Sequence, residues 1–191
     1  MATLVFVDIR GFTTFADSAT AREAVEFLNE FFATTIPVVE RLGGHANKLL
    51  GDGFLAVFGA PEPQPGHADQ ALEAGRELLS AVDERFGERC SIGVGINSGL
   101  VLVGTIGGGE LTEFGVIGDP VNVAARVQDQ TRELGEPLLL TEATRRLLDD
   151  GETAIVPRGE LVLRGKRAPV SVHGIAPVTV SRRPTPRTVR R

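Results

Sequence analysis

The stretch Thr3-Leu4-Val5-Phe6-Val7-Asp8 opens the chain with an apolar run that ends on a carboxylate. Aliphatic and aromatic residues in such a short run predict a buried strand. A second carboxylate, Asp52, lies in the turn Gly51-Asp52-Gly53 between two further apolar runs. We therefore expect both carboxylates at the tips of buried strands, on backbone with little freedom to move. Two carboxylates so placed can hold a pair of divalent cations about 3.5–4 Å apart, so phosphate chemistry is the first hypothesis.

The bulk composition favours a single globular domain. A chain of 191 residues that is 42% hydrophobic can bury one good core. The net charge of −5 argues against a nucleic-acid partner, because nucleic-acid-binding proteins usually carry a basic face. The single cysteine, Cys90, cannot form an internal disulfide, and we expect a buried, inert thiol in a strand.

The sequence also bears on where the protein works. No apolar stretch reaches the ~20 residues that span a bilayer, so we expect no membrane segment in this chain. The lone thiol fits a reducing compartment, and the expected location is the cytoplasm. The chain opens directly on a strand with no charged leader, which also fits a fragment of a longer, regulated or membrane-attached protein.

Hydrophobic periodicity predicts the order of the core elements. The first helix begins at a capping box, in which Thr20 and Glu23 cover free backbone N–H groups. The predicted core elements are a strand at 2–9, a helix at 20–42, strands at 46–50 and 54–58, a helix at 67–86 and a strand at 91–96. This βαββαβ order predicts an α+β fold with a ferredoxin-like core.

Additional elements are expected after this core. Asn97-Ser98-Gly99 predicts a turn into a strand at 100–106, which a Gly107–Gly109 tip joins to a strand at 111–117. Asp119 as N-cap and Pro120 at the first helical position predict a helix that reaches about residue 134. The remaining predicted elements are a strand at 138–141, a short helix at 142–149 and C-terminal strands at 154–163 and 169–175. The predicted domain is 1–176, followed by an arginine- and proline-rich, disordered tail at 177–191.

The residues that follow Asp8 suit a phosphate. The chain must turn at Ile9–Thr13, and Gly11 allows the backbone to approach a ligand closely. Successive free N–H groups at such a turn can cradle a phosphate. The alternative is an ordinary strand-to-helix turn in which Asp8 is a cap.

Two further pairs of polar residues share a face. Lys48 and Asp52 lie on one side of an extended segment, where the alternative is a weak surface ion pair. Asn122 and Arg126 are four residues apart near the start of a predicted helix. An arginine and an amide there suit an anion or a developing negative charge, and the alternative is a solvated helix surface.

Taken together, these motifs resemble the catalytic domain of the class III nucleotide cyclases over roughly residues 3–176. Their order and spacing also agree with that family. The matching stretches are Phe6-Val7-Asp8-Ile9-Arg10-Gly11-Phe12-Thr13, Lys48-Leu49-Leu50-Gly51-Asp52-Gly53-Phe54 and Val116-Ile117-Gly118-Asp119-Pro120-Val121-Asn122-Val123-Ala124-Ala125-Arg126.

The resemblance implies a head-to-tail homodimer with two active sites at its interface, each holding two Mg²⁺ or Mn²⁺ ions. One chain would bind the metals and the triphosphate, and its partner would bind the base and ribose. The implied site residues are Asp8, Asp52 and the Ile9 carbonyl for the metals, Gly11, Phe12 and Thr13 for the triphosphate, Lys48 for the purine, Asn122 for the ribose, Arg126 for the transition state and Lys166 for the terminal phosphates. The implied reaction converts ATP to a 3′,5′-cyclic nucleotide and pyrophosphate.

Two positions depart from the family pattern. Adenylate cyclases usually carry Asp or Thr at the position of Gly115, where guanylate cyclases more often have small residues. Guanylate cyclases, however, carry Glu where this chain has Lys48, and a lysine donor suits adenine N1. The resemblance thus implies an adenylate cyclase with a weakened adenine preference, and a guanylate or dual-specificity cyclase as the alternative. Pro137 stands where some relatives place a phosphate-binding arginine.

Two other functions are alternatives. A weakly active or silent nucleotide-binding regulatory module usually lacks a metal-binding Asp, the Asn or the Arg, and all are present here. A dinucleotide-forming cyclase usually shows a Gly-Gly-Asp/Glu-Glu-Phe hairpin, which Gly107-Gly108-Gly109-Glu110-Leu111 matches only in part. An adenylate cyclase is therefore the favoured hypothesis.

Overall fold

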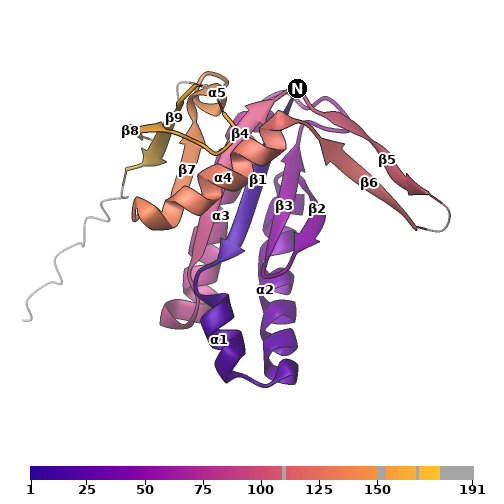
Figure 1. The fold of residues 1–191 in the computed structure, drawn as a ribbon, viewed down its shortest axis with the longest axis vertical. Coiled ribbons are helices and arrows are strands. Elements are labelled where there is room, and N and C mark those ends of the chain that lie inside the picture. The colour runs from indigo at the N-terminus through magenta and orange to yellow at the C-terminus, as the bar shows by residue number, and fades with distance from the viewer. Residues whose placement is uncertain (109–110, 150–153, 167, 177–191) are drawn as a thin grey trace, which may run out of the picture.

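The centre of the molecule is β1 (Ala2–Ile9), the strand that the opening stretch predicts, and it is buried along most of its length. The computed structural model describes residues 1–108, 111–149, 154–166 and 168–176 (Figure 1). The remaining elements, in chain order, are α1 (Phe12–Ser18), α2 (Ala21–Arg41), β2 (His45–Leu50), β3 (Gly53–Phe58), α3 (His67–Phe86), the 3-10 helix η1 (Gly87–Arg89), β4 (Ile92–Gly99), β5 (Leu102–Gly108), β6 (Leu111–Ile117), α4 (Asp119–Glu133), β7 (Leu138–Thr141), α5 (Glu142–Arg145), β8 (Ile155–Leu161) and β9 (Val170–Ile175).

The main sheet has seven strands in the order β2-β3-β1-β4-β7-β9-β8. β1 pairs antiparallel with β3 on one side and with β4 on the other. The first four strands in this order form the ferredoxin-like core, so the predicted α+β class and βαββαβ order are confirmed. β7 joins β4 in parallel, and β9 and β8 extend the sheet as antiparallel strands.

Helices cover both faces of this sheet. α2 and α3 pack on one face and α4 lies across the other (Figure 1). Alternate side chains of β1 point to opposite faces of the sheet. Val5 and Val7 pack in the core beneath α2 and α3, and Leu4 packs in the cluster beneath α4. Gly95 on β4 allows the close approach of α4, since an added Cβ would lie 2.6 Å from the Ala124 carbonyl oxygen.

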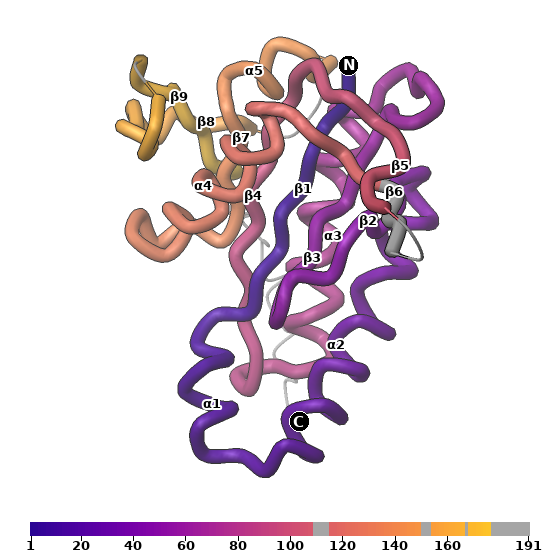
Figure 2. Tube along the Cα trace, turned by 45° about the vertical axis from the view of Figure 1, so that its right-hand side comes forward, coloured from indigo at the N-terminus to yellow at the C-terminus, as the bar shows by residue number. Residues whose placement is uncertain are grey.

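β5 and β6 form a separate two-stranded sheet that extends away from the main one (Figures 1 and 2). The predicted turn at Asn97-Ser98-Gly99 is wrong, because β4 continues to Gly99 and the chain turns afterwards. The polar side chains stay in the strand because they have partners there. Asn97 Nδ2 donates to the Pro120 carbonyl at 3.0 Å, and Thr141 Oγ1 donates to Asn97 Oδ1 at 2.7 Å.

Further expectations differ from the structure or fall outside the described residues. A short helix, α1, follows the turn at Gly11 and was not predicted. The N-cap of α4 is Gly118, and the helix predicted at 142–149 is the single turn of α5. Gly109 and the tail at 177–191 lie outside the described residues.

Among the described helices, none combines the length and the apolar character that a membrane span requires.

Candidate active site

The structure places the two predicted metal-binding carboxylates beside each other. Asp8, near the end of β1, faces Gly53 of β3 across the sheet, and Asp52 is the residue before Gly53 in the β2–β3 turn. Burial raises the pKa of the Asp8 carboxyl to about 6, with further contributions from the negative charges of Asp52 and Asp129. A carboxylate that is both desolvated and repelled by a neighbour needs a positive partner when it ionises.

A divalent cation fits this arrangement. Carboxylate and carbonyl oxygens are the ligands that Mg²⁺ prefers, and Asp8, Asp52 and the Ile9 carbonyl are the candidates here. Among the described residues, no group of three or more His, Cys, Asp or Glu side chains is arranged to hold a metal. The chain would thus supply part of the coordination shell, and water or substrate oxygens would have to complete it.

Gly53 leaves the space that the Asp8 side chain occupies, a role that the sequence did not reveal. An added Cβ on Gly53 would lie 2.9 Å from Asp8 Oδ1 and would overlap the Val7 carbonyl oxygen. Only glycine therefore allows the Asp8 carboxylate to lie against β3. The Gly51-Asp52-Gly53 sequence signalled a turn, but the need for a bare backbone opposite Asp8 appears only with the strand register.

The turn after β1 presents backbone N–H groups. Gly11 is the N-cap of α1 with φ 75°, which places Phe12 and Thr13 in the first helical turn, where N–H groups have no partner within the helix. Arg10 anchors this turn, because its Nη2 donates to the Thr131 carbonyl at 3.2 Å and the Glu136 carbonyl at 2.6 Å. This anchor links the end of β1 to the segment after α4.

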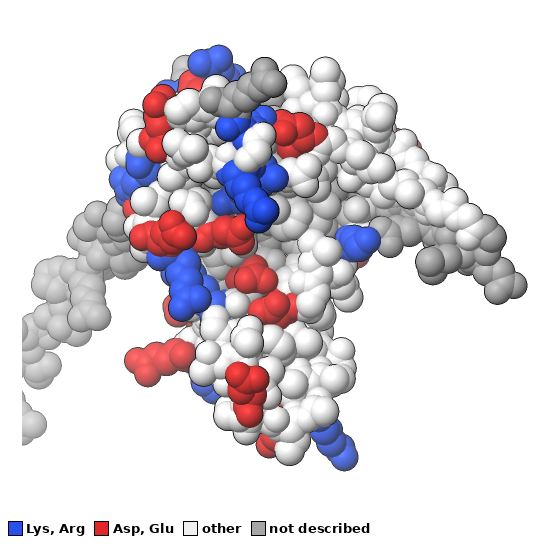
Figure 3. Space-filling view, in the orientation of Figure 1, with Lys and Arg blue, Asp and Glu red and all other residues white. Residues whose placement is uncertain are grey.

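A second group of predicted residues gathers around the start of α4. Asn122 is exposed and Arg126 is half-buried. The guanidinium nitrogens of Arg126 lie 3.8 Å from where a Cβ on Gly165 would be. Lys166, the next residue, donates to Asp119 Oδ2 at 2.6 Å. Basic side chains thus gather over the upper part of α4, with carboxylates below them towards the end of β1 (Figure 3).

The Asp119 carboxylate does not have the role that the sequence predicted. The N-cap of α4 is Gly118, one residue earlier, and the Asp119 carboxylate pairs with Lys166. The bond from Asn97 to Pro120 fixes the first turn of α4 to the sheet. Sequence reasoning missed this contact because Asn97 was assigned to a turn.

The two predicted base-recognition positions lie on strands that contact each other. Lys48 is exposed on β2, opposite Leu55 of β3. Gly115 lies on β6, opposite Gly104 of β5. β6 contacts β2 in the same chain, so the strands that carry Lys48 and Gly115 are neighbours. Figure 2 shows the β5–β6 hairpin close to β2.

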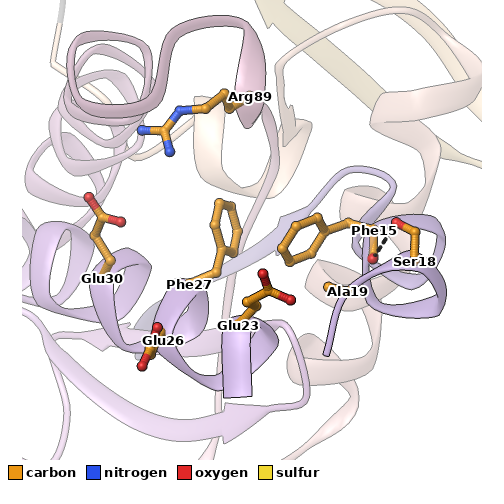
Figure 4. A pocket seen from close by; sticks show the side chains of 8 residues that line it. All are labelled: Phe15, Ser18, Ala19, Glu23, Glu26, Phe27, Glu30 and Arg89. Atoms are coloured by element: carbon orange, nitrogen blue, oxygen red, sulfur yellow. Dashed lines mark hydrogen bonds between the residues drawn. The ribbon is translucent and has the colours of Figure 1, made fainter. Parts of the chain in front are cut away.

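A hollow of about 650 Å³ between α1, α2 and η1 contains none of the predicted site residues. The rings of Phe15 and Phe27 point into it, beside three glutamates of α2 and Arg89 of η1 (Figure 4). Glu23 is occupied in the capping box with Thr20. Because the polar part of this wall is mainly acidic, the hollow does not suit a triphosphate.

Comparison with known proteins agrees with this geometry. The family model described as "Adenylate and Guanylate cyclase catalytic domain" matches residues 1–176. The chain belongs to this family. The match extends over the whole cyclase domain from β1 to the end of β9, and it leaves out the tail.

Solved structures share the fold of this cyclase domain. The adenylyl cyclase CyaB from P. aeruginosa has a TM-score of 0.82 at 24% identity, covering 92% of this chain and 93% of that one. The guanylyl cyclase Cya2 has a TM-score of 0.78 at 29% identity, covering 95% and 94%. Similar structures thus include cyclases of both specificities.

Curated relatives of the cyclase domain are longer proteins. The uncharacterized protein Rv1320c of Mycobacterium tuberculosis is 38% identical over 168 residues, which is 87% of this chain and 30% of that protein. The uncharacterized protein Rv1318c of the same organism is 35% identical over 94% of this chain and 33% of its own length. The chain spans about a third of the length of these relatives.

Proposed function

We propose that residues 1–176 form an adenylate cyclase domain that converts ATP to 3′,5′-cyclic AMP and pyrophosphate. The observation that carries the proposal is the pair of adjacent carboxylates, Asp8 and Asp52, on the ends of buried strands of a cyclase fold. Class III cyclases generally use divalent metal ions, and this pair suits them. A cytoplasmic location is part of the proposal, because ATP is available there.

When bound, two Mg²⁺ or Mn²⁺ ions would activate the ribose 3′-hydroxyl and offset charge on the triphosphate. The backbone N–H groups of the Gly11–Thr13 turn would hold phosphate oxygens. The 3′-oxygen would attack the α-phosphorus in line, its proton would pass to solvent water, and the bond from the α-phosphorus to pyrophosphate would break. Arg126 would donate to the oxygens on which negative charge develops, and Lys166 would exchange Asp119 for the terminal phosphates.

A homodimer would bring the two halves of the site together, with the carboxylates from one chain and Lys48, Asn122 and Arg126 from the other. Exposed apolar side chains support a second copy as the partner. They lie on β2 and around the β5–β6 hairpin, and each is at least 39% exposed in the single chain. They are Leu49, Leu50, Leu100, Leu102, Ile106 and Ile117.

Lys48 favours adenine, because its ammonium can donate to the unprotonated N1, whereas guanine N1 carries a hydrogen. A dual-specificity or guanylate cyclase is the second candidate, and the observation that favours it is Gly115, which offers the base no side chain. A weakly active nucleotide-binding module is the outcome if turnover is absent and nucleotide binding remains.

The first test is to incubate the protein with Mn²⁺ and either ATP or GTP and to measure the cyclic product. We expect cyclic AMP as the main product, and Asp52→Ala should abolish its formation. No product from either nucleotide would contradict the proposed activity.

The second test addresses the shared site. Asp52→Ala and Arg126→Ala chains are each expected to be inactive alone. In a mixed dimer one composite site keeps both residues, so a 1:1 mixture should recover up to about a quarter of wild-type activity. No recovery, with mixed dimers shown to form by tagged-chain capture, would exclude the shared site.

A further inference from the structure

Gly115 has no side chain where adenylate cyclases usually carry Asp or Thr, and a neighbouring residue fills that space. Gly115 is buried although it has no side chain of its own and lies on a hairpin that extends from the body. The side chain of Ile106, on the neighbouring strand β5, lies over it. A Cβ built on Gly115 would overlap the Ile106 Cδ1 atom and lie 3.2 Å from Ile106 Cγ1.

The strand register accounts for this contact. Gly104 pairs with Gly115, and Ile106 is two residues further along β5. Ile106 is therefore the diagonal neighbour of Gly115 on the same face of the hairpin. Leu102 is the diagonal neighbour on the other side, but the three atoms nearest to the added Cβ belong to Ile106 and Gly104.

Ile106 itself is unusually placed for an isoleucine. Its side chain is 43% exposed, so its methyl groups cover Gly115 on one side and face outwards on the other. No apolar core of the described chain requires it there. It covers Gly115, the position at which the resemblance to adenylate cyclases places a polar base selector.

We infer that Ile106 is a specificity-determining residue, which occupies the space of a polar selector and presents an apolar wall to the purine. This inference rests on the proposed function. Methyl groups contact adenine and guanine alike, so they cannot distinguish the 6-amino group of one from the 6-oxo group of the other. Of the two base-recognition positions, 48 and 115, only Lys48 then offers the base a polar side chain. The preference for ATP over GTP is therefore small.

The inference predicts that Ile106 and Gly115 act as a coupled pair. In Gly115→Asp alone, Ile106 must rotate away and competes with the new carboxylate for the same space. We therefore expect the ATP:GTP ratio of kcat/KM to rise less than about threefold. In Gly115→Asp/Ile106→Ala the carboxylate can accept from the 6-amino group, and the ratio should rise about tenfold or more. Ile106→Ala alone should leave the ratio within about twofold.

The matched control is Leu102→Ala, an exposed aliphatic residue on the same strand and face. Combined with Gly115→Asp, it should not raise the ratio above that of Gly115→Asp alone. Melting curves of every variant establish that the fold is retained. A full gain from Gly115→Asp by itself, or the same gain with Leu102→Ala, would overturn the inference.

Failure of the inference is distinguishable from failure of the proposed function. If the wild-type protein forms no cyclic product, the proposed activity is wrong, and the same variants are compared by calorimetric binding of ATP and GTP with Mn²⁺. The coupled gain should then appear in the ratio of dissociation constants. Equal ratios in the single and double variants would contradict the role of Ile106 in that case as well.

Discussion

The carboxylate end of the sheet and the β5–β6 hairpin are built in opposite ways. At the carboxylate end, Asp8 lies on a central strand between two antiparallel neighbours, and its carboxylate packs against the bare backbone of Gly53. The hairpin is a two-stranded sheet of its own, and Leu102 and Ile106 are exposed on it. The first region lies at the centre of the seven-stranded sheet. The second is a two-stranded sheet that joins the core through residues such as Val116 and leaves other side chains exposed.

Under the proposed function, the carboxylate end would carry the reaction and the hairpin would help to select the base. Residues that must keep a fixed distance for phosphoryl chemistry gain precision from a packed sheet. Exposed residues of the β5–β6 hairpin can be substituted with little effect on the stability of the core, because each of them contacts few neighbours. We therefore expect substitutions at the two regions to differ sharply in what they affect.

The largest effect should come from Asp8→Asn, which keeps the shape of the side chain but weakens its hold on a cation. Turnover should fall at least about 100-fold, measured as cyclic nucleotide formed with Mn²⁺. The melting temperature without metal should not fall, because the change removes repulsion with Asp52. Asp129→Asn is the matched control, since this carboxylate also raises the pKa of Asp8 but is not expected to bind metal. Asp129→Asn should lower turnover by less than about tenfold. An equal fall in turnover for both variants would show that Asp8 acts through charge alone.

The next effect concerns the thiol of Cys90, which is 6% exposed and part of the core, as expected. Its expected place in a strand is wrong, because Cys90 lies between η1 and β4. Burial raises its pKa from the ordinary 9.0 to about 11. The native thiol therefore stays protonated until the pH approaches 11, whereas the unfolded thiol ionises near 9. At pH 8 the native thiolate fraction is about 100-fold lower, and alkylation should be slower by at least that factor than in denaturant.

A cysteine on the hairpin sharpens the same comparison. In Cys90→Ala/Leu102→Cys, alkylation at pH 8 should approach the rate of the unfolded chain, because Leu102 is 79% exposed. Fast modification of native Cys90 would mean that the core opens more readily than its packing indicates.

The smallest of these effects should be on stability. Gly53→Ala forces a Cβ against the Val7 carbonyl and the Asp8 carboxylate, so the free energy of unfolding should fall by about 2 kcal/mol. Gly104→Ala on the hairpin has nothing within 4 Å of the new atom and should change stability by less than about 0.5 kcal/mol. Urea denaturation measures both, and equal losses would contradict the contrast between the regions.

Local signals predicted most of the secondary structure. The capping box of Thr20 and Glu23 starts α2 as predicted, and Gly51-Asp52-Gly53 lies at the β2–β3 turn. The errors came where a distant contact overrides a local preference. Asn97 and Ser98 are typical of turns, but hydrogen bonds to Pro120, Thr141 and Thr144 keep them in β4.

The candidate site also contains residues that local sequence patterns reveal and one that only distant contacts reveal. Its motifs could be found in the sequence because Asp8, Asp52, Asn122 and Arg126 each belong to a continuous stretch with a recognisable pattern. Ile106 could not be found in this way, since only the register of β5 against β6 places it over Gly115. The roles assigned to the site residues remain predictions for the experiments above.

By itself, the sequence determined the class of fold and the order of its elements, because hydrophobic periodicity and caps act over a few residues. Tertiary structure alone decided which residues meet: Asp8 with Gly53, Lys166 with Asp119, and Ile106 with Gly115. Such meetings depend on strand register and on the close approach of backbones at glycines. Those are properties of the packed chain, to which residues far apart in the sequence contribute together.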